Sequence, residues 1–294
     1  MKNCTILALR IAGLELKLYA RDSGLELAVP FVYEKFLQND LALQPATARA
    51  SETLSLSVRC RQHANEKRWG EPLCISEVWE LWLDETGHFV FTSPRQSPPK
   101  RVTIDPSFRT GEIVGDFSLV KNQGIYPLSS IDIRIMVNWL AGFSDLILHA
   151  SGVSVNGQGY CFLGESGAGK STLVSALAKD DSVTILGEDQ IILRYLDGQF
   201  WIYGTPWHER VEMCSPIGVP LRKMFFLNRI VEAGIEPVSP SEGISRILQT
   251  AFVPYYLPEK LPGIIERLTL LSKELPFFCL SYKLGSDILP SIIG

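Results

Sequence analysis

The most informative run of this chain reads Gly164-Glu165-Ser166-Gly167-Ala168-Gly169-Lys170-Ser171, with Thr172 directly after it. It fits G-x-x-x-x-G-K-[ST], the spacing of a loop that binds phosphate groups. Glycines let the backbone curl so that successive N–H groups point at phosphate oxygens, and the following helix adds the positive end of its dipole. We expect Lys170 to reach the β- and γ-phosphates of a nucleotide, and the Ser171 hydroxyl to bind Mg²⁺. The run therefore predicts a nucleotide-binding loop over residues 164–172.

The residues on either side of the loop support this interpretation. Residues 159–163 form a short apolar run typical of a buried strand, and residues 173–178 are typical of the first turns of a helix. Strand, loop and helix in this order are the context that the motif requires. The alternative is a turn rich in Gly and Ser that matches the spacing by chance.

The composition narrows the class of protein. The chain has 294 residues, a formal net charge of −4, 46% hydrophobic residues and 20% charged residues, so no strong attraction to nucleic acid is expected. Its six cysteines are scattered without a C-x-x-C pair, which argues against a zinc site and favours a reducing compartment. Arg10 interrupts the apolar start too early for a signal sequence, and no apolar run reaches the length of about 18 residues that a membrane span needs. We therefore expect a cytoplasmic protein with neither nucleic acid nor membrane as a partner.

The first part of the chain has the pattern of a β-rich domain. Residues 54–60 alternate apolar and polar side chains without a break, which predicts a strand with Leu54, Leu56, Val58 and Cys60 on its buried face. The apolar runs at 78–83 and 89–91 flank Asp84-Glu85-Thr86-Gly87-His88 and predict a β-hairpin. We therefore expect residues 1–115 to form a small β-rich domain.

The remainder, residues 116–294, has a different pattern. Apolar strand-like runs alternate there with stretches of helical periodicity, expected at 130–142, 243–253 and 259–271. The expected fold class is α/β for this part, and α+β for the chain as a whole.

Two neighbouring acids follow an apolar run downstream of the loop, in Leu186-Gly187-Glu188-Asp189. Carboxylates at that position can face the phosphate loop across a sheet, where one can hold Mg²⁺ and its neighbour can accept a proton from an attacking hydroxyl. The alternative is a pair of solvated turn acids.

Two further segments have two open interpretations each. His149 precedes the strands that lead into the loop, and it either contacts a transferred phosphoryl group or is a hydrogen-bonded core histidine. The segment Gly204-Thr205-Pro206-Trp207-His208 forms either a wall of the nucleotide or substrate site or a rigid turn with an aromatic plug.

At these residues the chain resembles the HPr kinase/phosphorylase superfamily, and within it the divergent HPr-kinase-like branch. His149-Ala150-Ser151-Gly152-Val153 is similar to that family's histidine-containing strand, residues 164–172 to its phosphate loop, and residues 186–189 to its paired-acid segment. The resemblance spans roughly residues 125–290 and is specific to the motifs within 149–227.

The resemblance implies a P-loop kinase core with a mixed sheet, shared with phosphoenolpyruvate carboxykinases. It also implies transfer of the ATP γ-phosphoryl to a serine-type hydroxyl of a peptide or protein, with Mg²⁺. Lys170 would then bind the phosphates, Ser171 and Asp189 the metal, and Glu188 would be the base. His149 would assist near the phosphate. Separately from the resemblance, the order of the domains suggests that residues 1–115 present or recognise the acceptor.

Two departures from the family separate this chain from its founding enzymes. Glu188 stands where the family usually has Asp, and the downstream Glu-x-Arg-Gly-x-Gly segment tied to phosphorolysis is absent from the sequence. HPr is therefore not the expected acceptor. Serine kinases of ribosomally made peptides belong to the divergent branch and suggest one class of acceptor.

Three other functions remain as alternatives. A small-molecule hydroxyl kinase would share the same residues, and a nucleotide-binding regulatory module without transfer would explain the two departures. A transporter-type ATPase or a GTPase fits worst, because the sequence has neither an L-S-G-G-Q-like stretch nor an N-K-x-D guanine reader. The sequence leaves both a monomer and a homo-oligomer open.

Overall fold

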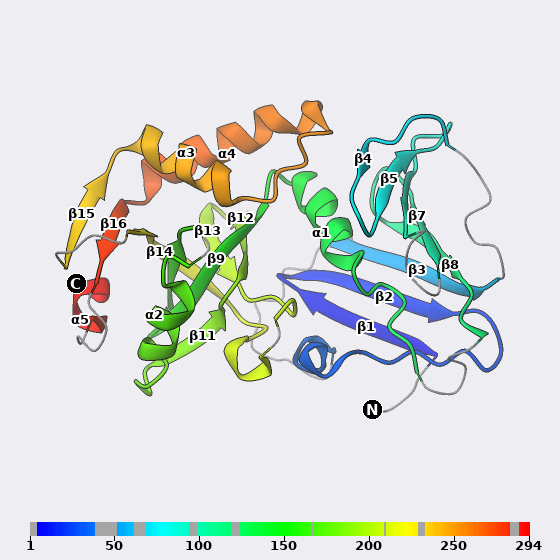
Figure 1. The fold of residues 1–294 in the computed structure, drawn as a ribbon, viewed down its shortest axis with the longest axis horizontal. Helices are drawn as coiled ribbons and strands as arrows, with labels where there is room; N and C mark the ends of the chain where they lie inside the picture. The colour runs from blue at the N-terminus through cyan, green and yellow to red at the C-terminus, as the bar shows by residue number, and fades with distance from the viewer. Residues whose placement is uncertain are drawn as a thin grey trace. The chain divides into compact units, whose positions relative to one another are not determined.

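The computed structural model describes residues 5–38, 52–61, 69–93, 99–118, 124–165, 167–208, 210–228, 233–282 and 288–294. It is a mixed α/β structure dominated by sheets (Figure 1). The chain divides into two compact units, Met1–Met136 and Val137–Gly294. This division falls inside α1 (Asp132–Ala141), later than the boundary after residue 115 that the sequence suggests.

The N-terminal unit is built on a sheet of eight described strands, in the order β1-β2-β3-β8-β7-β6-β5-β4. Their bounds are β1 (Ile6–Ile11), β2 (Leu14–Ala20), β3 (Thr53–Cys60), β4 (Cys74–Ile75), β5 (Glu80–Leu83), β6 (Phe89–Thr92), β7 (Lys100–Ile104) and β8 (Thr110–Gly115). A 3₁₀ segment, η1 (Phe31–Phe36), follows β2 in the described part of the chain. The β-rich character expected of this part is confirmed.

The alternation of β3 has the expected result. Leu54, Leu56 and Val58 are fully buried, whereas Cys60 at the strand end is only half-buried. The expected hairpin is also present, since β5 pairs antiparallel with β6 and Leu81 lies opposite Phe91.

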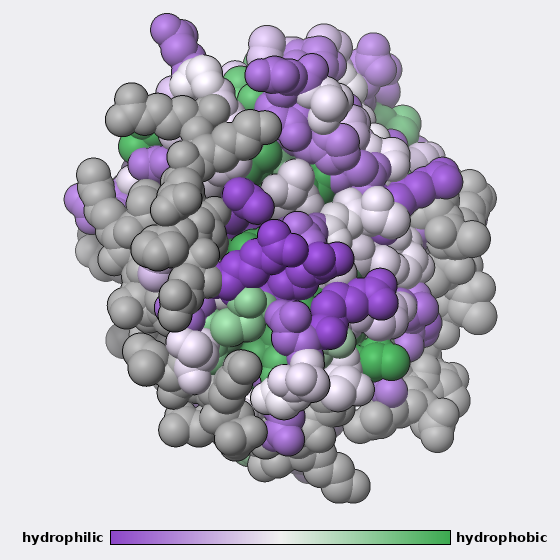
Figure 2. Space-filling view, turned by 90° about the vertical axis from the view of Figure 1, so that its right-hand side faces the viewer, coloured by the Kyte–Doolittle hydropathy of each residue, from purple (hydrophilic) through white to green (hydrophobic). Residues whose placement is uncertain are grey.

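Hydrophilic residues predominate among the coloured atoms of the face shown in Figure 2, where hydrophobic atoms are visible only in small separate areas.

A buried polar cluster lies in this unit. Lys100 Nζ donates a hydrogen bond of 2.7 Å to the carbonyl of Ser129. The Asp132 carboxylate accepts hydrogen bonds from the Tyr126 hydroxyl, at 3.2 Å, and from the Tyr33 hydroxyl. Burial lowers the pKa of Lys100 to about 8, and the charge of Asp132 opposes this shift. The cluster joins η1, β7 and the start of α1.

The second unit contains a sheet with the order β10-β9-β12-β13-β14-β16-β15, and β11 pairs with β9. The strands are β9 (Leu146–Val155), β10 (Gln158–Leu163), β11 (Val183–Gly187), β12 (Gln190–Leu196), β13 (Gln199–Tyr203), β14 (Gly218–Leu227), β15 (Gly234–Val238) and β16 (Phe277–Ser281). β10 also pairs with β14, in parallel, and β14 pairs in parallel with β16. These three strands therefore end at the same edge of the sheet.

Helices cover both faces of this sheet. α3 (Pro240–Thr250) and α4 (Leu261–Glu274) lie side by side on one face, and α2 (Lys170–Leu177) lies on the other (Figure 1). β10 contributes to both cores because its side chains alternate: Cys161 and Leu163 pack toward α3 and α4, and Tyr160 and Phe162 toward α2. The short α5 (Leu289–Ile293) packs with the α2 face.

The helices expected at 130–142, 243–253 and 259–271 are confirmed as α1, α3 and α4. Within the described residues, no helix combines the length and the apolar character needed to cross a membrane.

Candidate functional site

The loop between β10 and α2 has the strand–loop–helix context that the sequence predicts. β10 ends at Leu163 and α2 begins at Lys170. Gly167 and Gly169 have φ angles of 77° and 103°, in the left-handed region that favours glycine. A Cβ atom at Gly169 would lie 2.9 Å from the Tyr282 hydroxyl oxygen, so this position is also too close to its neighbour for a side chain.

The other residues of the expected loop are placed as follows. Gly164, Glu165 and Ala168 line a cavity, and Ser171 and Thr172 are exposed in the first turn of α2. Ser166 lies outside the described residues.

Lys170 is the buried cation of the site, with 7% of its surface exposed. Its Nζ donates to the carbonyl oxygens of Gly164, at 2.6 Å, and Glu165, at 3.2 Å, and lies 3.2 Å from His149 Nε2. Burial lowers the pKa of Lys170, and the charge of Asp189 opposes the shift. The side chain therefore folds back over the start of its own loop and meets the histidine of β9.

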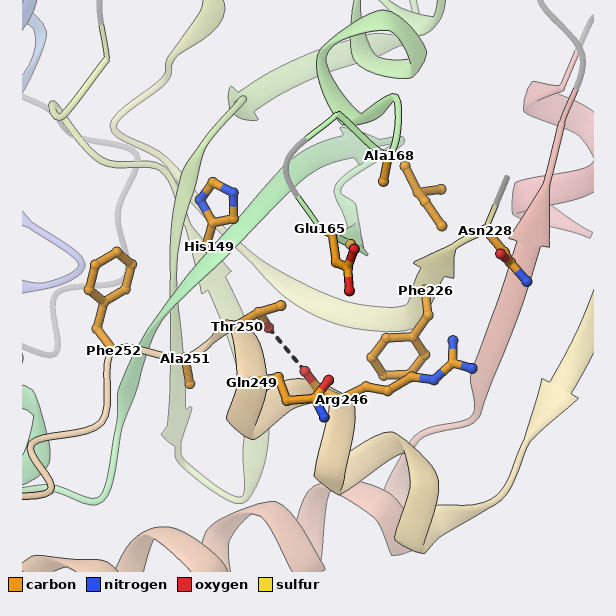
Figure 3. A pocket seen from close by; sticks show the side chains of 12 residues that line it. His149, Glu165, Ala168, Phe226, Asn228, Arg246, Gln249, Thr250, Ala251 and Phe252 are labelled. Carbon is orange, nitrogen blue, oxygen red and sulfur yellow. Dashed lines mark hydrogen bonds between the residues drawn. The ribbon is translucent and has the colours of Figure 1, made fainter. Parts of the chain in front are cut away.

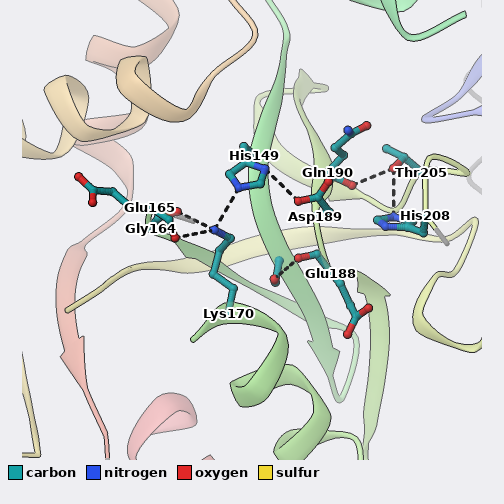
Figure 4. A network of polar contacts seen from close by, with 10 residues as sticks. His149, Gly164, Glu165, Lys170, Glu188, Asp189, Gln190, Thr205 and His208 are labelled. Carbon is teal, nitrogen blue, oxygen red and sulfur yellow. Dashed lines mark hydrogen bonds and ion pairs between the residues drawn. The ribbon is translucent and has the colours of Figure 1, made fainter. Parts of the chain in front are cut away.

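His149 links Lys170 to the second expected acid (Figure 4). His149 Nδ1 lies 3.0 Å from Asp189 Oδ1. An ammonium group can only donate, so Nε2 of a neutral His149 must accept from Lys170, which places the ring proton on Nδ1 facing Asp189. The hydrogen bond from His149 lowers the pKa of Asp189, so this carboxylate is ionised at neutral pH. The three side chains form a continuous polar chain, Lys170–His149–Asp189.

β9 also holds the backbone of the acid pair. The Ser151 hydroxyl donates to the carbonyl of Glu188, and the Ala150 N–H donates to that of Asp189 at 3.0 Å. The strand that carries His149 therefore fixes both acids.

The two acids have different partners. Glu188, whose side chain is 13% exposed, forms a two-pronged ion pair with Arg210: Nη2 contacts Oε1, and Nε lies 3.2 Å from Oε2. The Asp189 side chain is 51% exposed and faces His149. Glu188 is therefore paired with an arginine, whereas Asp189 belongs to the chain of contacts from Lys170 through His149.

The segment 204–208 folds back beside the acids. The Thr205 hydroxyl donates to the Gln190 carbonyl at 2.8 Å, and its oxygen lies 3.2 Å from His208 Nε2. A Cβ atom at Gly187 would lie 2.8 Å from this same ring nitrogen. Burial lowers the pKa of His208 to about 4, against the nearby charge of Asp189, so the ring is neutral at pH 7. The segment packs against the bend between β11 and β12 that carries the two acids.

A cavity of about 960 Å³ opens beside the loop. It is lined by residues of the loop, β9, the end of β14, and the last turn of α3 with the segment after it: His149, Gly164, Glu165, Ala168, Phe226, Leu227, Asn228, Arg246, Gln249, Thr250, Ala251 and Phe252. His149 and Phe252 lie on one side of it, Arg246 and Asn228 on the other, and Glu165 between them (Figure 3). Its volume is within the range of small-ligand sites, about 300–1,000 Å³.

The chain has oxygen donors of the kind that Mg²⁺ prefers. They are the Ser171 hydroxyl and the ionised Asp189 carboxylate. Mg²⁺ is commonly held by one or two carboxylates together with substrate phosphates and water. A cluster of three His, Cys, Asp or Glu residues is therefore not needed, and none occurs in the described part of the chain. The residues present fit an ion that arrives with a nucleotide.

Three residues at the site were missed in the sequence. Arg210 comes two residues after the segment 204–208, and only the fold places it on Glu188. Arg246 lies on α3, where helical periodicity gives no sign of a cavity. Tyr282 donates from its hydroxyl to the Gly169 carbonyl at 2.9 Å. Tyr282 directly follows β16, and the apolar run 277–281 before it was a signal in the sequence, because strand ends are common ligand positions.

Comparisons with known proteins add little to this geometry. No protein-family model matches the chain, and no curated protein is significantly similar to it in sequence. Among solved structures, the Hpr(Ser) kinase/phosphatase from Coxiella burnetii aligns with 50% of this chain and 85% of its own, at 14% sequence identity and a TM-score of 0.27. This is a distant structural similarity that decides neither the fold nor the activity.

Proposed function

We propose that this chain is a Mg²⁺-dependent kinase with an HPr-kinase-like P-loop core, which transfers the γ-phosphoryl group of ATP to a serine-type hydroxyl of a peptide or protein. The observation that carries the proposal is the chain of contacts from Lys170, at the end of the glycine loop, through His149 to Asp189. It brings a phosphate-binding cation and an ionised carboxylate to one edge of a sheet, beside a cavity of nucleotide size.

In the proposed reaction the loop binds the phosphates. The backbone N–H groups of the loop and the start of α2 face the β- and γ-phosphate oxygens. Lys170 exchanges its two carbonyl partners for phosphate oxygens, which compensates better for the burial of its charge. Mg²⁺ held by Ser171 and by the phosphates themselves would neutralise part of the phosphate charge, which leaves Asp189 free to accept a proton.

The transfer itself is a displacement at phosphorus. The acceptor oxygen bonds to the γ-phosphorus, the bond from that phosphorus to the β–γ bridging oxygen breaks, and ADP leaves. The hydroxyl proton passes to a carboxylate. Glu188 is the base that the family resemblance suggests, but its charge is engaged by Arg210. We therefore favour Asp189 as the proton acceptor, with His149 orienting it.

Two alternatives are kept. The Arg210–Glu188 ion pair favours a regulatory module that binds ATP without transferring phosphate, because it occupies one acid of the expected pair. A small-molecule acceptor would use the same residues. Recognition of a peptide by the N-terminal β-rich domain is part of the kinase proposal only.

Calorimetry and transfer assays test the proposal. Wild-type protein should bind Mg-ATP, and K170M should weaken binding by about tenfold or more, since one charged hydrogen bond contributes about 1.5–3 kcal/mol. The exposed Lys179 provides a matched control, K179M, which should bind normally. Serine-containing peptides, proteins and small hydroxyl compounds should then be incubated with γ-labelled ATP and analysed by mass spectrometry. Absence of ATP binding would overturn the function; binding without any phosphorylated product would favour the regulatory module.

A further inference from the structure

The cavity beside the loop has two chemically different sides. His149 and Phe252 lie on one side, and Asn228 and the guanidinium of Arg246 lie on the other (Figure 3). Taking the proposed kinase function as the premise, we propose that the Arg246 side receives the adenine base of ATP, so that the His149 side is left to the acceptor hydroxyl.

The direction of the sheet supports this assignment. β10 and β14 run parallel, so Gly164 and Asn228, which directly follow them, lie at the same edge. Ligands of α/β sheets bind outside the carboxyl ends of parallel strands. With the phosphates at the end of β10, a nucleotide that extends along this edge away from His149 reaches the end of β14.

Arg246 is held in a geometry suited to stacking. Its Nη2 lies 2.6 Å from Glu242 Oε1, and its guanidinium carbon lies 5.4 Å from the centre of the Phe226 ring. Phe226 is buried and lines the cavity, so its ring supports the arginine from the protein side. The Arg246 side chain keeps 35% of its surface exposed. A planar guanidinium fixed in this way stacks well on an aromatic ring such as a purine.

The neighbouring side chains match the edge of an adenine. Asn228 and Gln249 line the same side of the cavity and are both exposed. A side-chain amide presents one acceptor and two donors, which pair with the amino group and ring nitrogens of adenine. Ala168 and Ala251 contribute small apolar surfaces to the lining.

Binding of Mg-ATP and of magnesium tripolyphosphate, which has phosphates but no base, tests the proposal by calorimetry. R246A should raise the Kd for ATP about tenfold and leave that for tripolyphosphate within twofold. R246K keeps the positive charge but loses the planar guanidinium, so it should also raise the Kd for ATP. The control is R222A, at an exposed arginine of β14 outside the cavity lining, which should change neither Kd.

Other outcomes would contradict the assignment of the adenine base to the Arg246 side. An unchanged ATP affinity in R246A, or an equal loss for both ligands, would overturn the assignment of the base and leave the kinase proposal standing. If neither ligand binds wild-type protein, the proposed function fails and this assignment fails with it. If R246A does not fold, Q249A replaces it. The wild-type protein should bind ATP more tightly than GTP, and Q249A should reduce this difference in Kd. An unchanged difference would count against the assignment.

Discussion

Lys100 in the N-terminal unit and Lys170 in the second unit are both buried lysines, and burial lowers the pKa of each. Their partners differ. Lys100 donates to the Ser129 carbonyl near the buried Asp132, within a cluster that joins elements of the fold. Lys170 donates to carbonyls of its own loop and meets His149 beside a cavity.

The comparison teaches that a perturbed lysine is not in itself a sign of function. Burial explains both shifts, and the charge of an aspartate opposes each of them. What distinguishes Lys170 is the half-exposed carboxylate at the far end of its contact chain and the space next to it. A solvent-accessible carboxylate and room for a ligand separate a candidate catalytic lysine from a structural one.

The largest expected difference between the two lysines is in phosphoryl transfer. K170M should reduce the transfer rate by about 10³-fold, because it removes a preorganised charge at the transferred phosphate. K100M should leave the rate per folded molecule within about twofold. Single-turnover assays with γ-labelled ATP measure both, and a K170M variant with more than a tenth of the wild-type rate would break the distinction.

The next effect concerns the acid at the end of the Lys170 chain. D189N should slow transfer by about 10²-fold. This is the low end of the effect expected for loss of a general base, because His149 stays next to the site. E188Q is the matched control from the neighbouring residue and should cost less than tenfold, since Arg210 already engages that carboxylate. A larger loss in E188Q than in D189N would return the base assignment to Glu188.

A smaller effect should follow from weakening a contact of the loop just before Lys170. Y282F removes the hydroxyl that donates to the Gly169 carbonyl at 2.9 Å. ATP affinity should fall about threefold to tenfold, the range for one net hydrogen bond. Tyr255 is 62% exposed, so Y255F serves as the control in the same calorimetric titration. Equal affinities of Y282F and wild type would show that this contact does not shape the loop.

The smallest effect should come from Lys100, and in stability. Its pKa is about 8 in the folded chain against a usual value of 10.5, so the unfolded chain binds the extra proton between these pH values. Stability from this group therefore rises with pH from about 8 toward 10.5. Between pH 7.5 and 9.5 the Tm of wild type should rise by roughly 2–4 °C relative to K100M. Parallel Tm curves for the two proteins would contradict the burial argument.

Local patterns in the sequence were sufficient for much of the fold. The alternation of Leu54, Leu56 and Val58 identified a strand with a buried face, and the glycine spacing identified the loop between β10 and α2. Both signals arise from neighbouring residues whose backbone geometry is fixed by periodicity or by the left-handed φ of glycine.

Contacts between distant segments could not be obtained this way. The sequence suggested His149 and Asp189 as separate candidates, but the 3.0 Å contact between them depends on the pairing of β9 with β12. Arg210 was not singled out in the sequence, so its ion pair with Glu188 was unforeseen. The structure divides after Met136, inside α1, where the helical periodicity continues and gives no sign of a boundary.

The loop between β10 and α2 begins at a strand that is held firmly in the sheet. β10 is hydrogen-bonded along both of its sides, to β9 and to β14. The sheet therefore fixes the start of the loop at Gly164, which directly follows β10. At its other end, just before α2, the loop is held by the hydrogen bond from the Tyr282 hydroxyl to the Gly169 carbonyl. Tyr282 directly follows β16, so strands of one sheet hold both ends of the loop.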